Sequence, residues 1–331
     1  MIIPIFVPHK GCPNDCAFCN QHTISGKEEA PTIAEARNTI NEYLKTAKNT
    51  NNQIAFFGGS FTGIDVSEQN EYLKLANEFI NQGYVQSIRI STRPDYIDEN
   101  TVKRLINYGV KNIELGAQSM DKEVLLRSNR GHSVESVERA SDIILKCGAI
   151  LGLQMMTGLP EDSKEKNMKT AEKFLELGAK ETRIYPCVVL KGTMLEKMYR
   201  EGQYKPQSVE EAVEIGAKLK LFFDKNHISV LRIGLPESKS LKENYVAGAY
   251  HPALGELIFS RIIRNEIESN IKNDTKFIEI KANPGLISKI VGNKKCNINY
   301  FKEKEIGIKI IKDEIAGYSI KAISEQECQQ K

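Results

Sequence analysis

The chain has 331 residues, of which 40% are hydrophobic, and a formal net charge of +3. This length suits one large domain, or one domain with a small addition, and the composition is that of a globular protein. No stretch is long and apolar enough to cross a membrane, and so small a net charge decides nothing about a nucleic-acid partner.

The cysteines and the first residues indicate the compartment. Seven cysteines, an odd number of which three are clustered and four are scattered, argue against a disulfide framework and predict a reducing, cytoplasmic location. The apolar start, residues 1–8, has neither a basic region nor a cleavage site. We therefore expect it to form a buried strand rather than a signal peptide.

Short β-rich runs alternate with amphipathic stretches along roughly the first 190 residues. The predicted strands are 2–7, 53–57, 87–91, 112–115, 150–156 and 182–185, and the predicted helices are 32–47, 67–82, 98–108, 133–146 and 164–177. Two further helices, 193–201 and 208–225, and a strand, 228–233, follow. Six β-α repeats imply a parallel sheet with helices outside it, either open or closed towards a barrel.

The pattern changes near residue 239, so we predict a first domain at 1–238 and a small α+β domain at 239–331. In the second domain we expect a helix from His251 to about Asn270, followed by strands at 276–281, 296–301, 306–311 and 318–323. Its lysine-rich segments fit either an RNA contact or a solvated surface.

Three cysteines, Cys12, Cys16 and Cys19, form a C-x3-C-x2-C array directly after the first strand. Cysteine thiolates are the usual ligands of iron–sulfur clusters, and three of them leave the fourth iron of a 4Fe–4S cluster open for another molecule. A structural zinc site, with His9, His22 or a distant cysteine as fourth ligand, is an alternative. The C-x2-C half alone also fits a thioredoxin-like redox pair.

The array resembles the signature of the radical S-adenosylmethionine (SAM) superfamily. The resemblance implies that the open iron binds SAM. With an electron from a reducing donor, SAM is then cleaved into methionine and a 5′-deoxyadenosyl radical. It also implies an oxygen-sensitive cluster. Phe18, next to the third cysteine, is assigned to the SAM site by the same resemblance.

A glycine pair, Gly58 and Gly59, ends the second predicted strand and is followed by Ser60. Glycines at a strand end let the backbone approach a ligand closely, and a tight turn is the alternative interpretation. The run is similar to the Gly-Gly-Glu-like motif whose backbone meets the SAM amino group. Ser60 stands in place of the acidic residue, which leaves the backbone role intact.

Two further motifs resemble the branch that contains coproporphyrinogen dehydrogenase and the haem chaperones. The resemblance implies that Gln118 reaches a SAM ribose hydroxyl and that Arg130 pairs with the SAM carboxylate. Gln154, four residues before a Gly-Leu-Pro run, is implied to contact the ribose. An amide can donate to and accept from a hydroxyl, and a guanidinium is a bidentate partner of a carboxylate.

The strings 91–96 and 184–193 resemble the radical SAM half of the Elongator catalytic subunit, which modifies carbon 5 of the wobble uridine in tRNA. The resemblance covers about residues 1–235 and implies a partial TIM-type (β/α)6 barrel. The small α+β appendage predicted from the sequence pattern follows it. The first cysteine gap is narrower here, and the last 90 or so residues show no acetyl-CoA loop, so acetyl chemistry is not expected.

Together these observations predict a radical SAM enzyme with a 4Fe–4S cluster and SAM that acts on RNA, with tRNA as the expected substrate. One alternative is a radical SAM enzyme acting on a peptide or a small molecule. Another is a SAM- or haem-binding protein without turnover. Arg93, at the predicted catalytic rim, could bind substrate or SAM or brace its loop, and Cys187 is expected to be a buried hydrophobe.

Overall fold

The computed structural model describes residues 1–7, 12, 16–20, 29–47, 51–272 and 275–324. The chain divides into two compact units, one of residues 1–212 and 222–252 and the other of residues 213–221 and 253–331. His9 and His22, the histidines considered as zinc ligands, lie outside the described residues. Among the helices described, none has the length and apolar character of a membrane-spanning segment.

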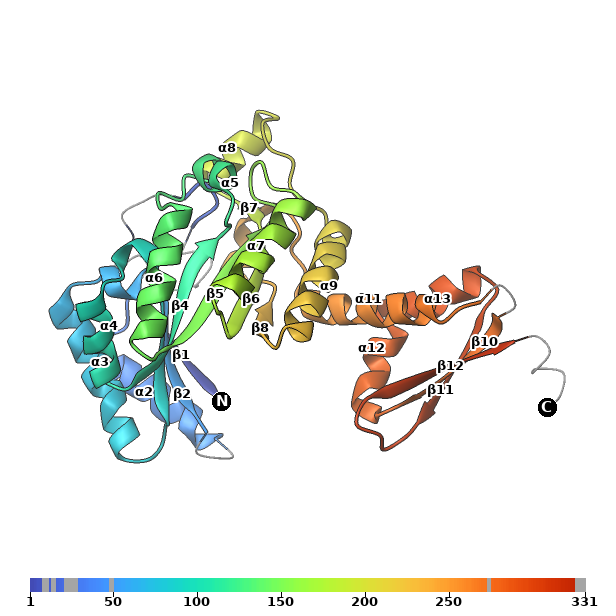
Figure 1. Ribbon diagram of the computed structural model, residues 1–331, viewed down its shortest axis with the longest axis horizontal. Helices are drawn as coiled ribbons and strands as arrows, with labels where there is room; N and C mark the ends of the chain where they lie inside the picture. The colour runs from blue at the N-terminus through green and yellow to red at the C-terminus, as the bar shows by residue number, and fades with distance from the viewer. Residues whose placement is uncertain (8–11, 13–15, 21–28, 48–50, 273–274, 325–331) are drawn as a thin grey trace. The chain divides into compact units, whose positions relative to one another are not determined.

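The first unit is built on a parallel sheet of seven strands. Its strands are β1 (Ile2–Val7), β2 (Gln53–Gly58), β3 (Ser87–Thr92), β4 (Val110–Gln118), β5 (Ile150–Thr157), β6 (Glu181–Pro186) and β8 (Ser229–Ile233), in the order β1-β2-β3-β4-β5-β6-β8. The sheet curls into a half-barrel, which confirms the predicted fold class (Figure 1). Strand β8 pairs with β6 and adds a seventh strand to the six predicted repeats.

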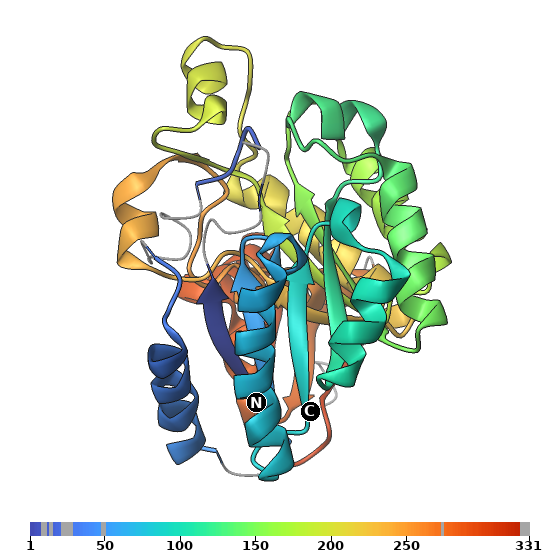
Figure 2. The same cartoon turned by 90° about the vertical axis from the view of Figure 1, so that its left-hand side faces the viewer.

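Helices cover the outer face of this sheet (Figure 2). They are α2 (Ile33–Lys45), α3 (Val66–Asn81), α4 (Glu99–Asn107), α6 (Val134–Lys146) and α7 (Lys164–Glu176), while α5 (Lys122–Arg127), α8 (Met194–Arg200) and α10 (Lys239–Asn244) belong to the connections. Helix α9 (Val209–Lys225) has its residues 213–221 grouped with the second unit. A small antiparallel pair, β7 (Val188–Leu190) with β9 (Tyr245–Gly248), also belongs to this unit. The sequence had predicted neither α5 nor this pair.

Local signals in the sequence set the ends of these helices. Thr32 and Glu35 form a capping box at the start of α2, and Asp98 caps α4 by accepting from the Thr101 amide. At the other end of α4, Gly109 takes a φ of +93°, which a residue with a side chain rarely adopts. A Cβ there would also lie 2.7 Å from Ile80 Cδ1, so only glycine fits between α4 and β4.

The inner face of the half-barrel carries a buried ion network centred on Glu114. Its carboxylate receives Nε and Nη2 of Arg183 at 2.6 and 3.0 Å and Nη1 of Arg89 at 2.8 Å. Arg89 also pairs with Glu181 at 2.6 Å. Burial alone would raise the pKa of Glu114, but the two guanidinium groups hold it below its usual value. The network is balanced, with two positive and two negative groups.

The second unit contains α11 (Leu254–Ser269), β10 (Thr275–Ala282), α12 (Ile287–Val291), α13 (Cys296–Glu303), β11 (Gly307–Lys312) and β12 (Tyr318–Ser324). Its three-stranded sheet has the order β11-β10-β12, with β10 parallel to β11 and antiparallel to β12. The boundary at 238 and 239 stays a prediction, and β9, which follows it, pairs within the first unit.

The predicted strand at 296–301 is wrong, because this segment forms helix α13. Its alternation of polar with β-branched and aromatic residues favoured a strand. Tertiary burial decides otherwise, since Asn297 and Phe301, four residues apart, face the core on one side of a helix. Asn297 Nδ2 donates to the carbonyl oxygens of Ser260 and Ile290, which fixes the helix in place.

We predict that Glu114→Gln lowers the free energy of unfolding by about 3–5 kcal/mol, because it leaves Arg183 buried without a counter-charge and turns an amide donor toward other donors. Denaturant unfolding of the whole chain measures the effect. The exposed Glu99→Gln, which removes only a surface pair with Lys103, is the control and should change stability by less than about 1 kcal/mol. Equal effects of the two substitutions would contradict the role given to the network.

Candidate functional site

The described part of the cysteine segment is held at the carboxyl end of the sheet by backbone hydrogen bonds. The Ala17 amide donates to Ser128 O at 2.9 Å, and the Leu195 amide donates to Ala17 O at 2.8 Å. A turn joins the Cys19 amide to Cys16 O at 2.9 Å. The segment is therefore fixed between the end of α5 and the start of α8.

Cys16 is buried, and one guanidinium reaches it. Arg130 Nη1 donates to Cys16 Sγ at 3.3 Å, and Arg130 Nη2 donates to Gly116 O at 2.7 Å. Arg130 thus links the cysteine segment to the end of β4. A Cβ on Gly116 would lie 2.9 Å from Arg130 Nη2, so the missing side chain makes room for this link.

The end of β4 also positions Gln118. The register between β4 and β5 shifts between Leu115 and Gln118, and Gln118 has a φ of 66°. Such a bulge redirects a side chain. Here it turns Gln118 toward Gly116: a Cβ built on Gly116 would lie 2.9 Å from Gln118 Nε2, the same distance as from Arg130 Nη2. Gln118 and Arg130, which the resemblance assigned from one segment after the fourth strand, are therefore neighbours.

His132, from the segment between α5 and α6, is a third side chain that lies against the end of β4. Its Nε2 lies 3.2 Å from Ala117 O, and because a carbonyl only accepts, Nε2 carries the proton. Burial, with the charges of Arg130 and Arg93, lowers the pKa of His132 to about 3. The imidazole is therefore neutral at physiological pH.

Three buried atoms at this point have no hydrogen-bond partner among the described residues. They are Gln118 Oε1, Arg130 Nε and His132 Nδ1. An unsatisfied buried polar atom costs about 1–3 kcal/mol, and such atoms usually mark a missing water or ligand. An acceptor, a cationic donor and a second acceptor are what a ligand with hydroxyl and carboxylate groups would pair with.

Arg93, directly after β3, binds the backbone of Arg130. Its Nη1 donates to Arg130 O at 3.0 Å, while Nε and Nη2 bind both carboxylate oxygens of Asp95. Burial alone would lower the pKa of Arg93, but Asp95, Cys16 and Cys12 raise it. Of the roles considered for Arg93, bracing the loop is the one that these interactions describe.

The glycine pair lies where β2 leaves the sheet. Gly58 has a φ of 120°, and the Gly59 amide donates to Val7 O at 3.0 Å. The Ser60 hydroxyl is buried against Thr92 Oγ1 at 2.8 Å and accepts from the Arg93 amide. Ser60 therefore acts here as a loop anchor, and any ligand contact from this turn would come from its backbone.

Gln154 and Phe18 lie in different surroundings. Gln154 Nε2 donates to Ser91 Oγ and to Glu114 Oε2, so its amide oxygen is the atom left for a ribose hydroxyl. Phe18 packs on an apolar cluster that contains the fully buried Cys187. Burial raises the pKa of Cys187 to about 12, so this thiol is a core residue, as expected.

The cysteines fit an iron–sulfur cluster in their chemistry. Cys12, Cys16 and Cys19 form no disulfide. Within the described residues, no three His, Cys, Asp or Glu side chains converge as ligands of one metal ion would. A 4Fe–4S cluster makes a different demand, since each thiolate binds its own iron and the sulfur atoms stay apart.

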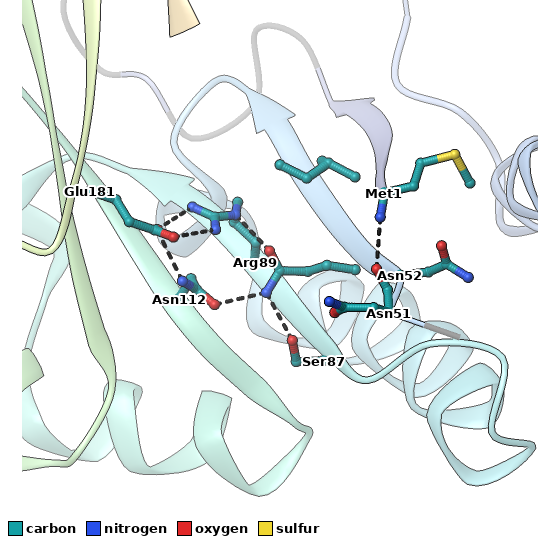
Figure 3. Close-up of a pocket in the computed structure, with 9 residues that line it drawn as sticks. Met1, Asn51, Asn52, Ser87, Arg89, Asn112 and Glu181 are labelled. Atoms are coloured by element: carbon teal, nitrogen blue, oxygen red, sulfur yellow. Dashed lines mark hydrogen bonds and ion pairs between the residues drawn. The ribbon is translucent and has the colours of Figure 1, made fainter. Parts of the chain in front are cut away.

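A separate pocket of about 340 Å³ lies at the amino ends of the strands (Figure 3). Its charged groups and several amides pair with one another: Arg89 binds Glu181, and Asn112 bridges Gln53 and Glu181. It lies at the opposite end of the strands from the cysteines. We assign it to the packing of the sheet rather than to a ligand.

The sequence motifs assigned no role to Gly116, His132 or Glu114, although all three lie within or near segments that the resemblance had marked. The sequence offered two signals: Gly116 stands two residues before Gln118, and His132 stands two residues after Arg130. Their roles depend on the bulge and on the fold around it, which no local pattern encodes.

The fold and the cysteine array define a class of enzymes that work at the carboxyl end of a parallel half-barrel. The family model described as the radical SAM superfamily matches residues 6–174, and the radical SAM C-terminal domain matches residues 179–264. The chain belongs to the radical SAM superfamily and is a radical SAM enzyme. The family implies a 4Fe–4S cluster and SAM.

Among its relatives is the tRNA uridine(34) acetyltransferase of Methanocaldococcus jannaschii, 25% identical over 90% of this chain and 62% of the relative. Human Elongator complex protein 3 is 31% identical over 40% of this chain and 25% of its own. The chain thus spans less than two thirds of these proteins. The solved structure of Methanocaldococcus infernus Elp3 has a TM-score of 0.65 at 22% identity, covering 80% of this chain and 63% of its own, and shows the shared fold.

We predict that stability depends on pH through His132. Its pKa is about 3 when folded and about 6.5 when unfolded, so the unfolded state binds the extra proton, and stability is lost as pH falls through that window. The loss approaches about 1.4 kcal/mol per pH unit. Denaturant unfolding between pH 7 and pH 5 should show a steeper loss for the natural chain than for His132→Gln. Parallel curves would contradict the buried, neutral imidazole.

Proposed function

We propose that the protein uses a 4Fe–4S cluster and SAM to modify RNA, with tRNA as the substrate class. The observation that carries the proposal is the hydrogen bond from Arg130 to Cys16, next to buried atoms of Gln118, Arg130 and His132 that have no partner among the described residues. Relatives named for tRNA uridine 34 and for the Elongator complex support RNA as the substrate.

In this proposal the residues of the chain bind and orient a 4Fe–4S cluster and SAM. When bound, the cluster and SAM supply reductive cleavage to a 5′-deoxyadenosyl radical. Cys12, Cys16 and Cys19 hold the cluster, and Arg130 provides a positive charge for the SAM carboxylate. Gln118 and the oxygen of Gln154 meet ribose hydroxyls, the turn at Gly58–Ser60 offers backbone to the amino group, and Phe18 anchors the cysteine segment.

The neutral His132 suits the same site. A charged imidazole next to Arg130 and Arg93 would place three cations together in a buried space, which is unfavourable. Because His132 stays neutral, Nδ1 can accept a hydrogen bond while the guanidinium of Arg130 provides the charge. The group added to the RNA stays unassigned.

The first prediction tests the SAM site. Replacing Arg130 by Ala should weaken SAM binding roughly 10- to 100-fold, because the carboxylate loses a charge-assisted hydrogen bond. Titration calorimetry on anaerobically reconstituted protein measures it, and the iron content reports whether the cluster is retained. The exposed Arg127→Ala is a control that removes the same charge nearby. Unchanged SAM affinity in Arg130→Ala would remove this residue from the proposed site.

The second prediction tests the reaction. Nucleosides of tRNA and rRNA from strains with and without the gene are compared by mass spectrometry. A nucleoside should disappear on deletion and return with the intact gene and with Cys147→Ala, but not with Cys16→Ala, because only Cys16 belongs to the cluster array. A nucleoside profile that does not change on deletion would reject RNA as the substrate and leave peptides, small molecules or a non-catalytic binding role.

A further inference from the structure

We propose that the outer face of the sheet in the second unit binds a single-stranded segment of RNA, an inference that rests on the proposed function because it assumes an RNA substrate. This face is formed by β10, β11 and β12. The amino-acid sequence alone left its lysines undecided between an RNA contact and a solvated surface. The arrangement of the side chains across the three strands favours RNA.

Alternation along β10 separates two faces. Ile278 and Ile280 are fully buried in a core that also takes residues from α11, α12 and α13. Phe277, Glu279 and Lys281, the residues between and beside them, lie outside that core. Because neighbouring residues of a strand point to opposite sides, these three define the outer face.

The register places more lysines on this face. Glu279 of β10 pairs with Lys309 of β11 on one side and with Lys321 of β12 on the other. Lys281 pairs in the same way with Ile311 and Ser319. Paired residues share a face, so one carboxylate lies among three lysines. The face has a net charge of +2.

These lysines are exposed and make no ion pair within the part of the chain that the structure describes. Other lysines of the unit behave differently, since Lys304 pairs with Glu268 at 2.8 Å and Lys289 lies 3.6 Å from Glu256. Residues 275–323 contain ten lysines against five acidic residues, a surplus larger than the +3 of the whole chain. The positive charge of the chain is therefore concentrated in this segment.

An aromatic ring lies on the same face. Phe277 is half-buried, and a Cβ built on its register partner Gly307 would lie 2.6 Å from its ring. The ring thus covers the glycine and is held against the sheet, with Ile323 as its partner on the other strand. A fixed aromatic ring next to lysines is the combination that stacks an unpaired base and holds the phosphates beside it.

The test is fluorescence anisotropy of the full chain with a labelled single-stranded RNA of about twelve nucleotides, a length in the range that such surfaces cover. The triple variant Lys281→Ala, Lys309→Ala, Lys321→Ala should bind at least tenfold more weakly. The slope of log affinity against log salt should become less steep by about 2, because each of the three lost lysine–phosphate contacts accounts for roughly 0.7. Phe277→Leu keeps Gly307 covered and should bind about 5- to 150-fold more weakly at an unchanged slope.

The control removes the same charge elsewhere. Lys103, Lys146 and Lys173 are exposed lysines of the first unit that pair with acidic neighbours. Their triple alanine variant should bind RNA like the natural chain. If the sheet variant matches this control in affinity and salt slope, the proposal is overturned. Equal binding of a DNA duplex overturns it as well, because a duplex offers no unpaired base to Phe277.

This test is independent of the nucleoside comparison. If RNA binds through the sheet face but no nucleoside is lost on deletion, the proposed reaction fails while the surface stands. If a nucleoside is lost but binding is unaffected by the sheet variants, the surface fails while the reaction stands. Thermal unfolding of each variant shows whether a weaker affinity comes from the missing side chains or from loss of the fold.

Discussion

One guanidinium, that of Arg130, joins the cysteine segment to the sheet. It donates to Cys16 Sγ with one nitrogen and to Gly116 O with another, so the Cys16 thiol is fixed relative to the end of β4. Arg93 in turn holds the carbonyl of Arg130. The other residues at the end of β4 are positioned around this link, which ties the cysteine segment to the sheet through a side chain of its own.

This link is made inside a half-barrel whose interior is polar. A parallel sheet covered by helices usually fills its inner face with apolar side chains. Here Glu114, Arg89 and Arg183 occupy that face, and both arginines pair with Glu114. Removing the carboxylate would leave buried positive charges without a partner, which costs several kcal/mol. The same carboxylate also binds Gln154, so the network that stabilises the barrel extends to a residue of the proposed site.

Residues whose environment follows from local pattern were predicted well from the sequence. The six strands and the helices between them follow from alternation and capping residues. The roles of Gln118 and Arg130 come from the resemblance and stay predictions. Residues whose environment depends on distant parts of the chain were not predicted. Residues 296–301 alternate like a strand, yet the burial of Asn297 against α11 makes them helical. His132 gained its role only when the bulge at Gln118 placed the Ala117 carbonyl beside it.

The two ends of the half-barrel differ in the polar groups that they carry. At the amino ends, Arg89, Asn112 and Glu181 bind one another beside a pocket of about 340 Å³. At the carboxyl ends, an amide oxygen, a guanidinium nitrogen and an imidazole nitrogen are buried without partners among the described residues. Folding does not recover the desolvation cost of those three atoms, so a bound water or a ligand must do so. The position of these atoms, rather than the size of any cavity, is the physical reason for proposing the SAM site beside Cys16.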